Sequence, residues 1–120
     1  MILHELLAQM TTELGEEPRP MKLLSLLAPD AVLEHAANKN FIFGKRSIPA
    51  KYKLLASIAI AAALGSETCT ATYVKSGLRK GLSREEITEA ILLARFVKAS
   101  TVLAAAVPAM EALAGTPQEG

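Results

Sequence analysis

Residues 54–64 form an apolar segment, interrupted only by Ser57, and it constrains the fold more than any other feature of the chain. The run Ser47, Ile48, Pro49 before it and Gly65 after it predict one helix, because Ser caps helix starts and Pro is tolerated in the first turn. Crossing a bilayer takes about 20 apolar residues, so we expect a buried helix and not a membrane anchor. A helix without a polar face must be covered all round, which places it centrally or at a subunit interface.

The first 44 residues also carry helical patterns. Apolar residues from Ile2 to Leu14 recur on one face, and Gly15 is placed to end that helix. A short apolar turn over 21–28 and a helix over 30–44, capped by Asp30, are expected next. The residues of that helix expected to face inward are Val32, Leu33, Ala36, Ala37 and Phe41.

The next helix is expected over about 67–80. Residues 82–87 then carry the clearest local signal of the chain. Ser83 with Glu86 forms a capping box, and Leu82 with Ile87 forms a hydrophobic staple, which together mark a helix start. The apolar stripe expected to be buried on that helix is Ile87, Ala90, Ile91, Ala94 and Val97.

A last helix, predicted over about 101–113, is apolar nearly all round and contains Pro108, which should kink or split it. No strand-like alternation accompanies these patterns, so the expected fold is all-α and compact. We expect one domain over residues 1–120. It would comprise N-terminal helices over 1–44, a helical core over 45–114 and a flexible tail over 115–120.

The composition of the chain restricts the classes of partner that it is expected to bind. A net charge of +1, an aromatic content of 4% and the absence of Trp argue against nucleic acid and against an anionic membrane surface. A single cysteine and an N-terminus without a basic leader favour a reducing cytoplasm. Two nearly uniformly apolar helices exceed what one small core can hide, which predicts a homo-oligomer held by helix faces. The alternative is a monomer with a tightly packed alanine core.

The one candidate chemical centre is the stretch 65–73 (GSETCTATY), where one helix ends and another begins. With Ser66 as N-cap, Cys69 lies in the first turn, where free N–H groups and the helix dipole favour a thiolate. The competing interpretation is a small buried hydrophobic side chain. No cofactor or metal is expected, because His35 has no second ligand at a metal-binding spacing.

Two basic clusters are weaker signals. Lys75, Arg79 and Lys80 share a helix surface that could bind an anion, although a solvated face is the better interpretation without a Gly-rich loop. A second cluster lies near a helix start, where positive charge opposes the helix dipole, and an acidic ligand or a neighbouring subunit could explain it. Its members are Lys45, Arg46, Lys51 and Lys53.

The order of motifs over about 45–107 resembles the carboxymuconolactone decarboxylase and alkylhydroperoxidase D-like family. A Lys-rich helix start (51–55), a long apolar helix, GSETCTATY and GLSREEITEAILLA follow one another as in that family. The resemblance implies an all-helical fold that assembles as a homotrimer or homohexamer.

The resemblance also assigns roles. The peroxidase branch uses a Cys-x-x-Cys-x-x-x-His motif and an upstream Glu, in which the second Cys attacks the peroxide and the first resolves the sulfenate. On this chain the attacking position is Cys69, while the resolving Cys, the His and the Glu correspond to Ser66, Tyr73 and Leu54. Glu67 could replace the missing acid/base or simply favour the helix start.

Three functions follow from this pattern. The first is a one-cysteine (hydro)peroxide reductase in which Cys69 is the nucleophile, Tyr73 and Ser66 support it, and an external thiol is the reductant. The second is a non-catalytic helical oligomer or ligand-binding protein. The third is a lactone decarboxylase. The resemblance implies that the decarboxylase branch of the family uses a His at the position that Tyr73 occupies in this chain.

Overall fold

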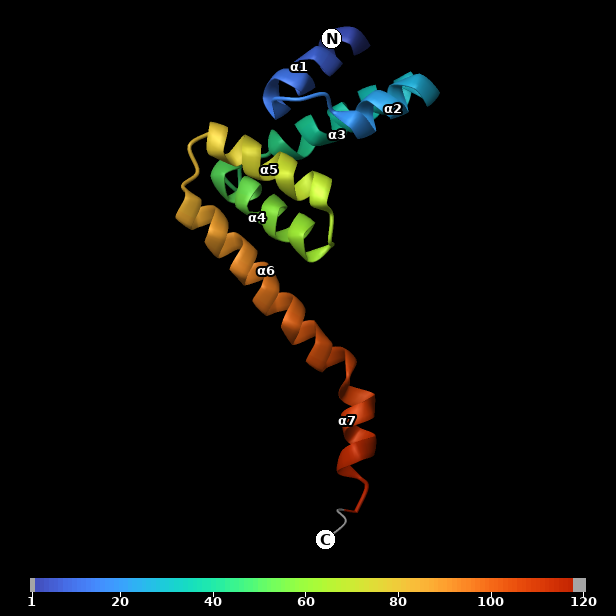
Figure 1. Ribbon diagram of the computed structural model, residues 1–120, viewed down its shortest axis with the longest axis vertical. Helices are drawn as coiled ribbons and strands as arrows, with labels where there is room; N and C mark the ends of the chain where they lie inside the picture. The colour runs from blue at the N-terminus through green and yellow to red at the C-terminus, as the bar shows by residue number, and fades with distance from the viewer. Residues whose placement is uncertain (1, 118–120) are drawn as a thin grey trace.

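The computed structural model describes residues 2–117, and these form seven α-helices and no strand (Figure 1). This confirms the all-α prediction. The helices are α1 (Leu3–Leu14), α2 (Arg19–Leu27), α3 (Pro29–Phe43), α4 (Ala50–Ala63), α5 (Glu67–Arg79), α6 (Arg84–Ala105) and α7 (Val107–Ala114).

The apolar segment forms α4, and this helix packs against both α5 and α6. Its central position agrees with the expectation drawn from its lack of a polar face. Burial of apolar side chains removes their surface from water, and the cluster between the three helices is the main core of the chain. The buried members of this core are Leu54, Ile58, Leu82, Ile87 and Ala90.

The N-terminal helices form a second group, in which α2 packs along α3 and α1 contacts α2, α3 and α5. Residues 21–28, predicted to be a turn, belong mostly to helix α2, because Pro20 in its first turn is compatible with a helix start. The predicted cap at Asp30 is wrong. Pro29 is the first residue of α3, Asp30 lies in its first turn, and Ala28 is the N-cap. Ser47 likewise caps nothing, since Pro49 is the N-cap of α4.

The local signals at residues 82–87 and 15 are confirmed. Ser83 Oγ accepts the N–H of Glu86, and the Glu86 carboxylate accepts the N–H of Ser83, at 3.0 and 2.9 Å. Gly15 ends α1 with a positive φ of 82°, and its N–H donates to the carbonyl of Thr11.

Five of the apolar side chains predicted to face inward are exposed. On α3, Val32 is fully buried and Ala36 is half-buried, but Leu33, Ala37 and Phe41 are exposed. On α6, Ile91 and Val97 are exposed, whereas Ile87, Ala90 and Ala94 are buried. In both helices the periodicity marks an apolar stripe wider than the surface that neighbouring helices of this chain cover.

The C-terminal helices differ from the prediction in where they break. The sequence predicted a separate last helix from about residue 101, yet α6 continues to Ala105 because no residue in that stretch interrupts a helix. The break falls at Ala106, and Pro108 lies in the first turn of α7. A proline is tolerated there because the N–H groups of a first turn make no hydrogen bond within the helix. The two helices meet at an angle of 49°.

The chain is extended, which corrects the expectation of a compact domain. Its dimensions are 71 × 35 × 27 Å and its radius of gyration is 19.8 Å, whereas a compact chain of this length has a radius of about 14 Å. The cause is visible in Figure 1, where the second half of α6 and all of α7 project away from the other helices. The predicted flexible tail over 115–120 falls partly on residues 118–120, which lie outside the described residues.

Among residues 2–117, no single helix is both long enough and apolar enough to cross a bilayer. The bent pair α6 and α7 together meet that length and composition.

Candidate functional site

The candidate centre lies where α4 ends and α5 begins. Gly65 has a φ of 76°, a backbone conformation that residues with a side chain rarely adopt. The N–H of Gly65 donates to the Ala62 carbonyl and that of Ser66 to the Ala61 carbonyl, both at 3.1 Å. These two bonds form a Schellman motif, which satisfies the last carbonyls of α4. The motif allows α5 to begin immediately at Glu67.

Ser66 connects the two helices and contacts the backbone of Cys69. As N-cap of α5, its Oγ accepts the N–H of Cys69 at 3.2 Å, and its carbonyl accepts the hydroxyl of Thr70 at 2.6 Å. Ser66 therefore occupies the capping role predicted for it. Cys69 is the third residue of the helix, at the end where the dipole stabilises negative charge.

Cys69 is an exposed free thiol, so the alternative of a small buried hydrophobic side chain is wrong. Glu67 is also exposed, in the same first turn. Its carboxylate places one negative charge at the helix start, which offsets part of the dipole that a Cys69 thiolate would use.

The other two predicted positions do not join Cys69 at the surface. Tyr73 is half-buried and packs against the main core, and Leu54 is a core residue with 4% of its surface exposed. Within residues 2–117 neither side chain makes a polar contact with Cys69. The structure thus brings Ser66, Glu67 and Cys69 together in one turn, and it places Tyr73 and Leu54 in apolar packing.

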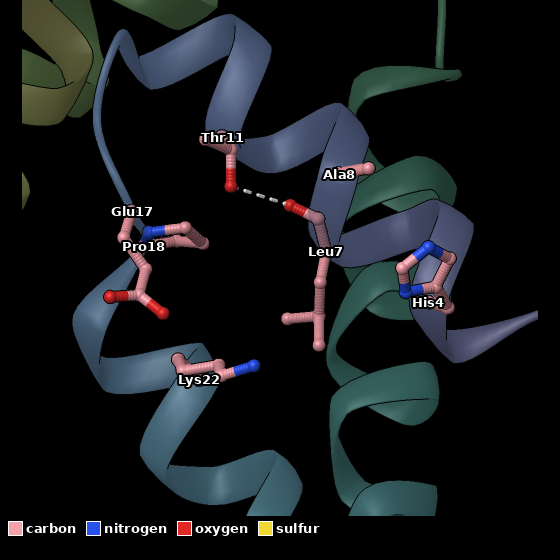
Figure 2. A pocket seen from close by; sticks show the side chains of 7 residues that line it. All are labelled: His4, Leu7, Ala8, Thr11, Glu17, Pro18 and Lys22. Carbon is pink, nitrogen blue, oxygen red and sulfur yellow. Dashed lines mark hydrogen bonds between the residues drawn. The ribbon is translucent and has the colours of Figure 1, made fainter.

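Two hollows lie elsewhere on the molecule. Figure 2 shows the first, of about 180 Å³, between α1 and α2, where Leu7 and Lys22 point into the same space and Thr11 donates to the Leu7 carbonyl at 2.9 Å. It is completed by His4, Ala8, Glu17 and Pro18. The second is a shallow depression at the start of α6, lined by Arg84, Glu85, Thr88 and Glu89. Cys69 lines neither hollow.

The hollow between α1 and α2 was not foreseen from the sequence. His4 is 18 residues away from Lys22, and only the reversal of the chain at Gly15 and Pro18 brings them near one another. The part of the chain that the structure describes contains no group of three or more His, Cys, Asp or Glu side chains that could hold a metal ion.

The basic cluster near the start of α4 has intramolecular partners. Lys53 Nζ donates to the carbonyls of Ile42, at 2.9 Å, and of Lys45 at the end of α3, where cationic groups are favourable. The ammonium of Lys45 lies 4.7 Å from the centre of the Phe41 ring. Neither an acidic ligand nor another subunit is needed to account for these two lysines.

Lys51 extends the same cluster to the capping box of α6. Its Nζ lies 2.6 Å from the carboxylate of Glu86. The hydrogen bond and the charge of this carboxylate raise the pKa of Lys51. The bonds from Lys51 and from the Ser83 backbone lower the pKa of Glu86. One carboxylate therefore connects the starts of two core helices.

The cluster of Lys75, Arg79 and Lys80 is exposed, as expected for a solvated face, and two of its members also contact the end of α1. Lys75 pairs with Glu16 at 3.2 Å, and Arg79 donates to the Thr12 carbonyl at 2.7 Å. Both contacts attach α5 to the C-terminal end of α1. The last carbonyls of a helix accept no hydrogen bond from the N–H groups of that helix, so they are free to accept one from Arg79.

Comparison with known proteins assigns the chain to a family. The model of the carboxymuconolactone decarboxylase family matches residues 28–112, so the chain belongs to this family. The match confirms the resemblance noted over 45–107 and extends it to α3 and most of α7. No curated protein matches the chain at the significance required.

Proposed function

We propose that this member of the family is a one-cysteine, thiol-dependent peroxide reductase with Cys69 as its nucleophile. The observation that carries the proposal is an exposed thiol in the first turn of α5, whose N-cap hydroxyl accepts the N–H of Cys69 itself. Exposure lets a peroxide reach the sulfur, and the helix start stabilises the thiolate.

The chemistry requires two half-reactions. The Cys69 thiolate attacks the terminal peroxide oxygen, the O–O bond breaks, and the alkoxide leaves as alcohol after taking a proton from water, so the sulfur becomes a sulfenic acid. Ser66 has no sulfur to resolve it, so an external thiol displaces water to form a mixed disulfide. A second external thiol then regenerates Cys69 and leaves as a disulfide, as a reducing cytoplasm would permit.

The test compares peroxide consumption, in excess dithiol, by the wild type and by Cys69→Ala. A matched control moves the thiol by one residue in the double variant Cys69→Ala, Thr68→Cys, since Thr68 is exposed in the same turn. We expect turnover in the wild type only. Equal rates in the wild type and the control would show that Cys69 reacts only as an ordinary surface thiol. Equal rates in all three proteins would exclude the reaction.

A second candidate is a helical assembly that retains the fold without the chemistry, as a homotrimer or homohexamer. It is favoured by the packing of Leu54 and Tyr73 into the core, at the positions where relatives of the peroxidase branch carry proton-transfer groups. Absence of turnover in the assay above, combined with a mass that is a multiple of 12.7 kDa by light scattering, would support it.

A further inference from the structure

The C-terminal arm, defined as residues 95–114, projects from the folded helices without a covering surface (Figure 1). Every residue of it is exposed except Ala106, which is half-buried, and α7 has its main contacts with α6. The arm carries no charge between Lys98 and Glu111. Its large exposed apolar side chains are Phe96, Val97, Val102, Leu103, Val107, Met110 and Leu113.

A second apolar surface is uncovered on α4. Tyr52, Ala56, Ile60 and Leu64 recur at intervals of four residues, so they form one ridge of the helix, and all four are exposed. We call them the α4 ridge. They lie on the side of α4 away from its buried residues Leu54, Ile58 and Ala61, because those positions point about 140° away around the helix.

The arm cannot cover the α4 ridge of its own chain. It continues α6, which packs on the buried side of α4, and Lys98 donates to the Ala63 carbonyl at the point where α4 ends. Beyond that point α6 and α7 meet at an angle of 49° around Ala106, which is far from a reversal of direction. Within its own chain the α4 ridge therefore stays uncovered.

The exposed area gives the scale of the missing contact. The chain exposes 9060 Å², whereas a folded monomer of this mass exposes about 6,200 Å². The excess of about 2,800 Å² per copy exceeds the share of each partner in most obligate interfaces, which bury about 2,000–5,000 Å² in total. An unpartnered apolar surface of this size is unfavourable in water.

We propose that the arm of one copy packs on the α4 ridge of a second copy, so that the arms are exchanged between copies. This rests on the homo-oligomer proposed above and identifies the surfaces that form it. One association covers both surfaces. The α4 ridge has no charged residue, and the charges of the arm (Arg95, Lys98 and Glu111) lie toward its two ends, so the uncharged stretch 99–110 can be covered without burying an unpaired charge. A helix that lies in the membrane interface would need a basic polar face, which residues 99–110 lack.

The test combines variants on the two surfaces with light scattering. Leu103→Glu on the arm and Ile60→Lys on the ridge each place a charge in the proposed contact, and both positions are exposed, so folding is retained. We expect each to weaken self-association by roughly 100-fold. The control Leu27→Glu changes a side chain that is 84% exposed on α2, outside both surfaces, and should leave the mass unchanged.

Mixing the two variants tests the exchange directly. In a reciprocal mixed pair, Glu at position 103 and Lys at position 60 lie in the same arm–ridge contact with opposite charges, while the second arm and ridge are unaltered, so assembly should return. An assembly that neither variant weakens would overturn the arm proposal alone. A 12.7 kDa wild type would overturn both proposals of self-association, and so would a monomer that sediments with phosphatidylcholine–phosphatidylglycerol vesicles.

Discussion

Gly77 lies in the last turn of α5 (Glu67–Arg79), at a position where the structure leaves no room for a side chain. A Cβ there would lie 2.7 Å from Cδ1 of Leu82 and 3.7 Å from Cδ1 of Ile58. The N–H of Leu82 donates to the Gly77 carbonyl at 2.9 Å, and only 6% of Leu82 is exposed. Because both the backbone and the side chain of Leu82 are held, it cannot withdraw freely from a methyl group at position 77.

The free energy of unfolding of Gly77→Ala depends on two opposing effects. Ala is favoured over Gly inside a helix by about 1 kcal/mol, whereas an extra methyl group in a packed core costs about 1–3 kcal/mol. The short distance to Leu82 makes the second effect the larger one. We expect Gly77→Ala to destabilise the protein by about 1 kcal/mol.

A double-mutant cycle by chemical denaturation separates the two effects. Leu82→Val removes the Cδ1 atom that meets the new methyl group, so in that background Gly77→Ala should stabilise the protein by up to about 1 kcal/mol. All four proteins are compared at one concentration, because self-association would make stability depend on it. The same change in both backgrounds would refute the steric explanation.

Three further predictions concern helix ends. Because Lys51 and Ser83 lower the pKa of Glu86 below 4.5, its stabilising effect should be complete above that pH and be lost as the pH falls through the lowered pKa. Denaturation midpoints should therefore fall less on acidification in Glu86→Gln than in the wild type, and parallel curves would contradict this. Lys53→Met should lower the free energy of unfolding by about 1 kcal/mol by leaving the end of α3 uncapped, and unchanged hydrogen exchange there would contradict it. Ser66→Ala should cost about 1 kcal/mol and Ser66→Asp much less, and equal denaturation midpoints for both would argue against capping.

The features that the sequence predicted well are local ones. The capping box of Ser83 and Glu86, the cap of Cys69 by Ser66 and the helix end at Gly15 each depend on groups within four residues of one another. Neighbouring residues supply the groups for such contacts, because a helix end must satisfy its free N–H and carbonyl groups wherever it lies. The wrong caps at Asp30 and Ser47 show that a capping residue type alone does not decide where a helix begins. The order of motifs over residues 45–107 was likewise sufficient to predict the family, which the match over residues 28–112 confirms.

Contacts between distant residues could not be predicted. The role of Lys53 at the end of α3 depends on how α3 and α4 meet, and nothing in the residues beside it indicates those carbonyls. The exposure of Leu33, Phe41 and Val97 has a similar origin. Periodicity identifies an apolar face, but only the arrangement of helices decides whether that face has a neighbour.

By itself, the sequence determined that the chain is helical, where most helices begin and end, and that Cys69 lies in the first turn of one of them. Tertiary structure alone decided that Cys69 is exposed while Tyr73 and Leu54 pack in the core. It also decided that the apolar C-terminal residues form an uncovered arm. The physical reason is that helix formation follows from hydrogen bonds between near neighbours, whereas burial depends on surfaces brought together from distant parts of the chain.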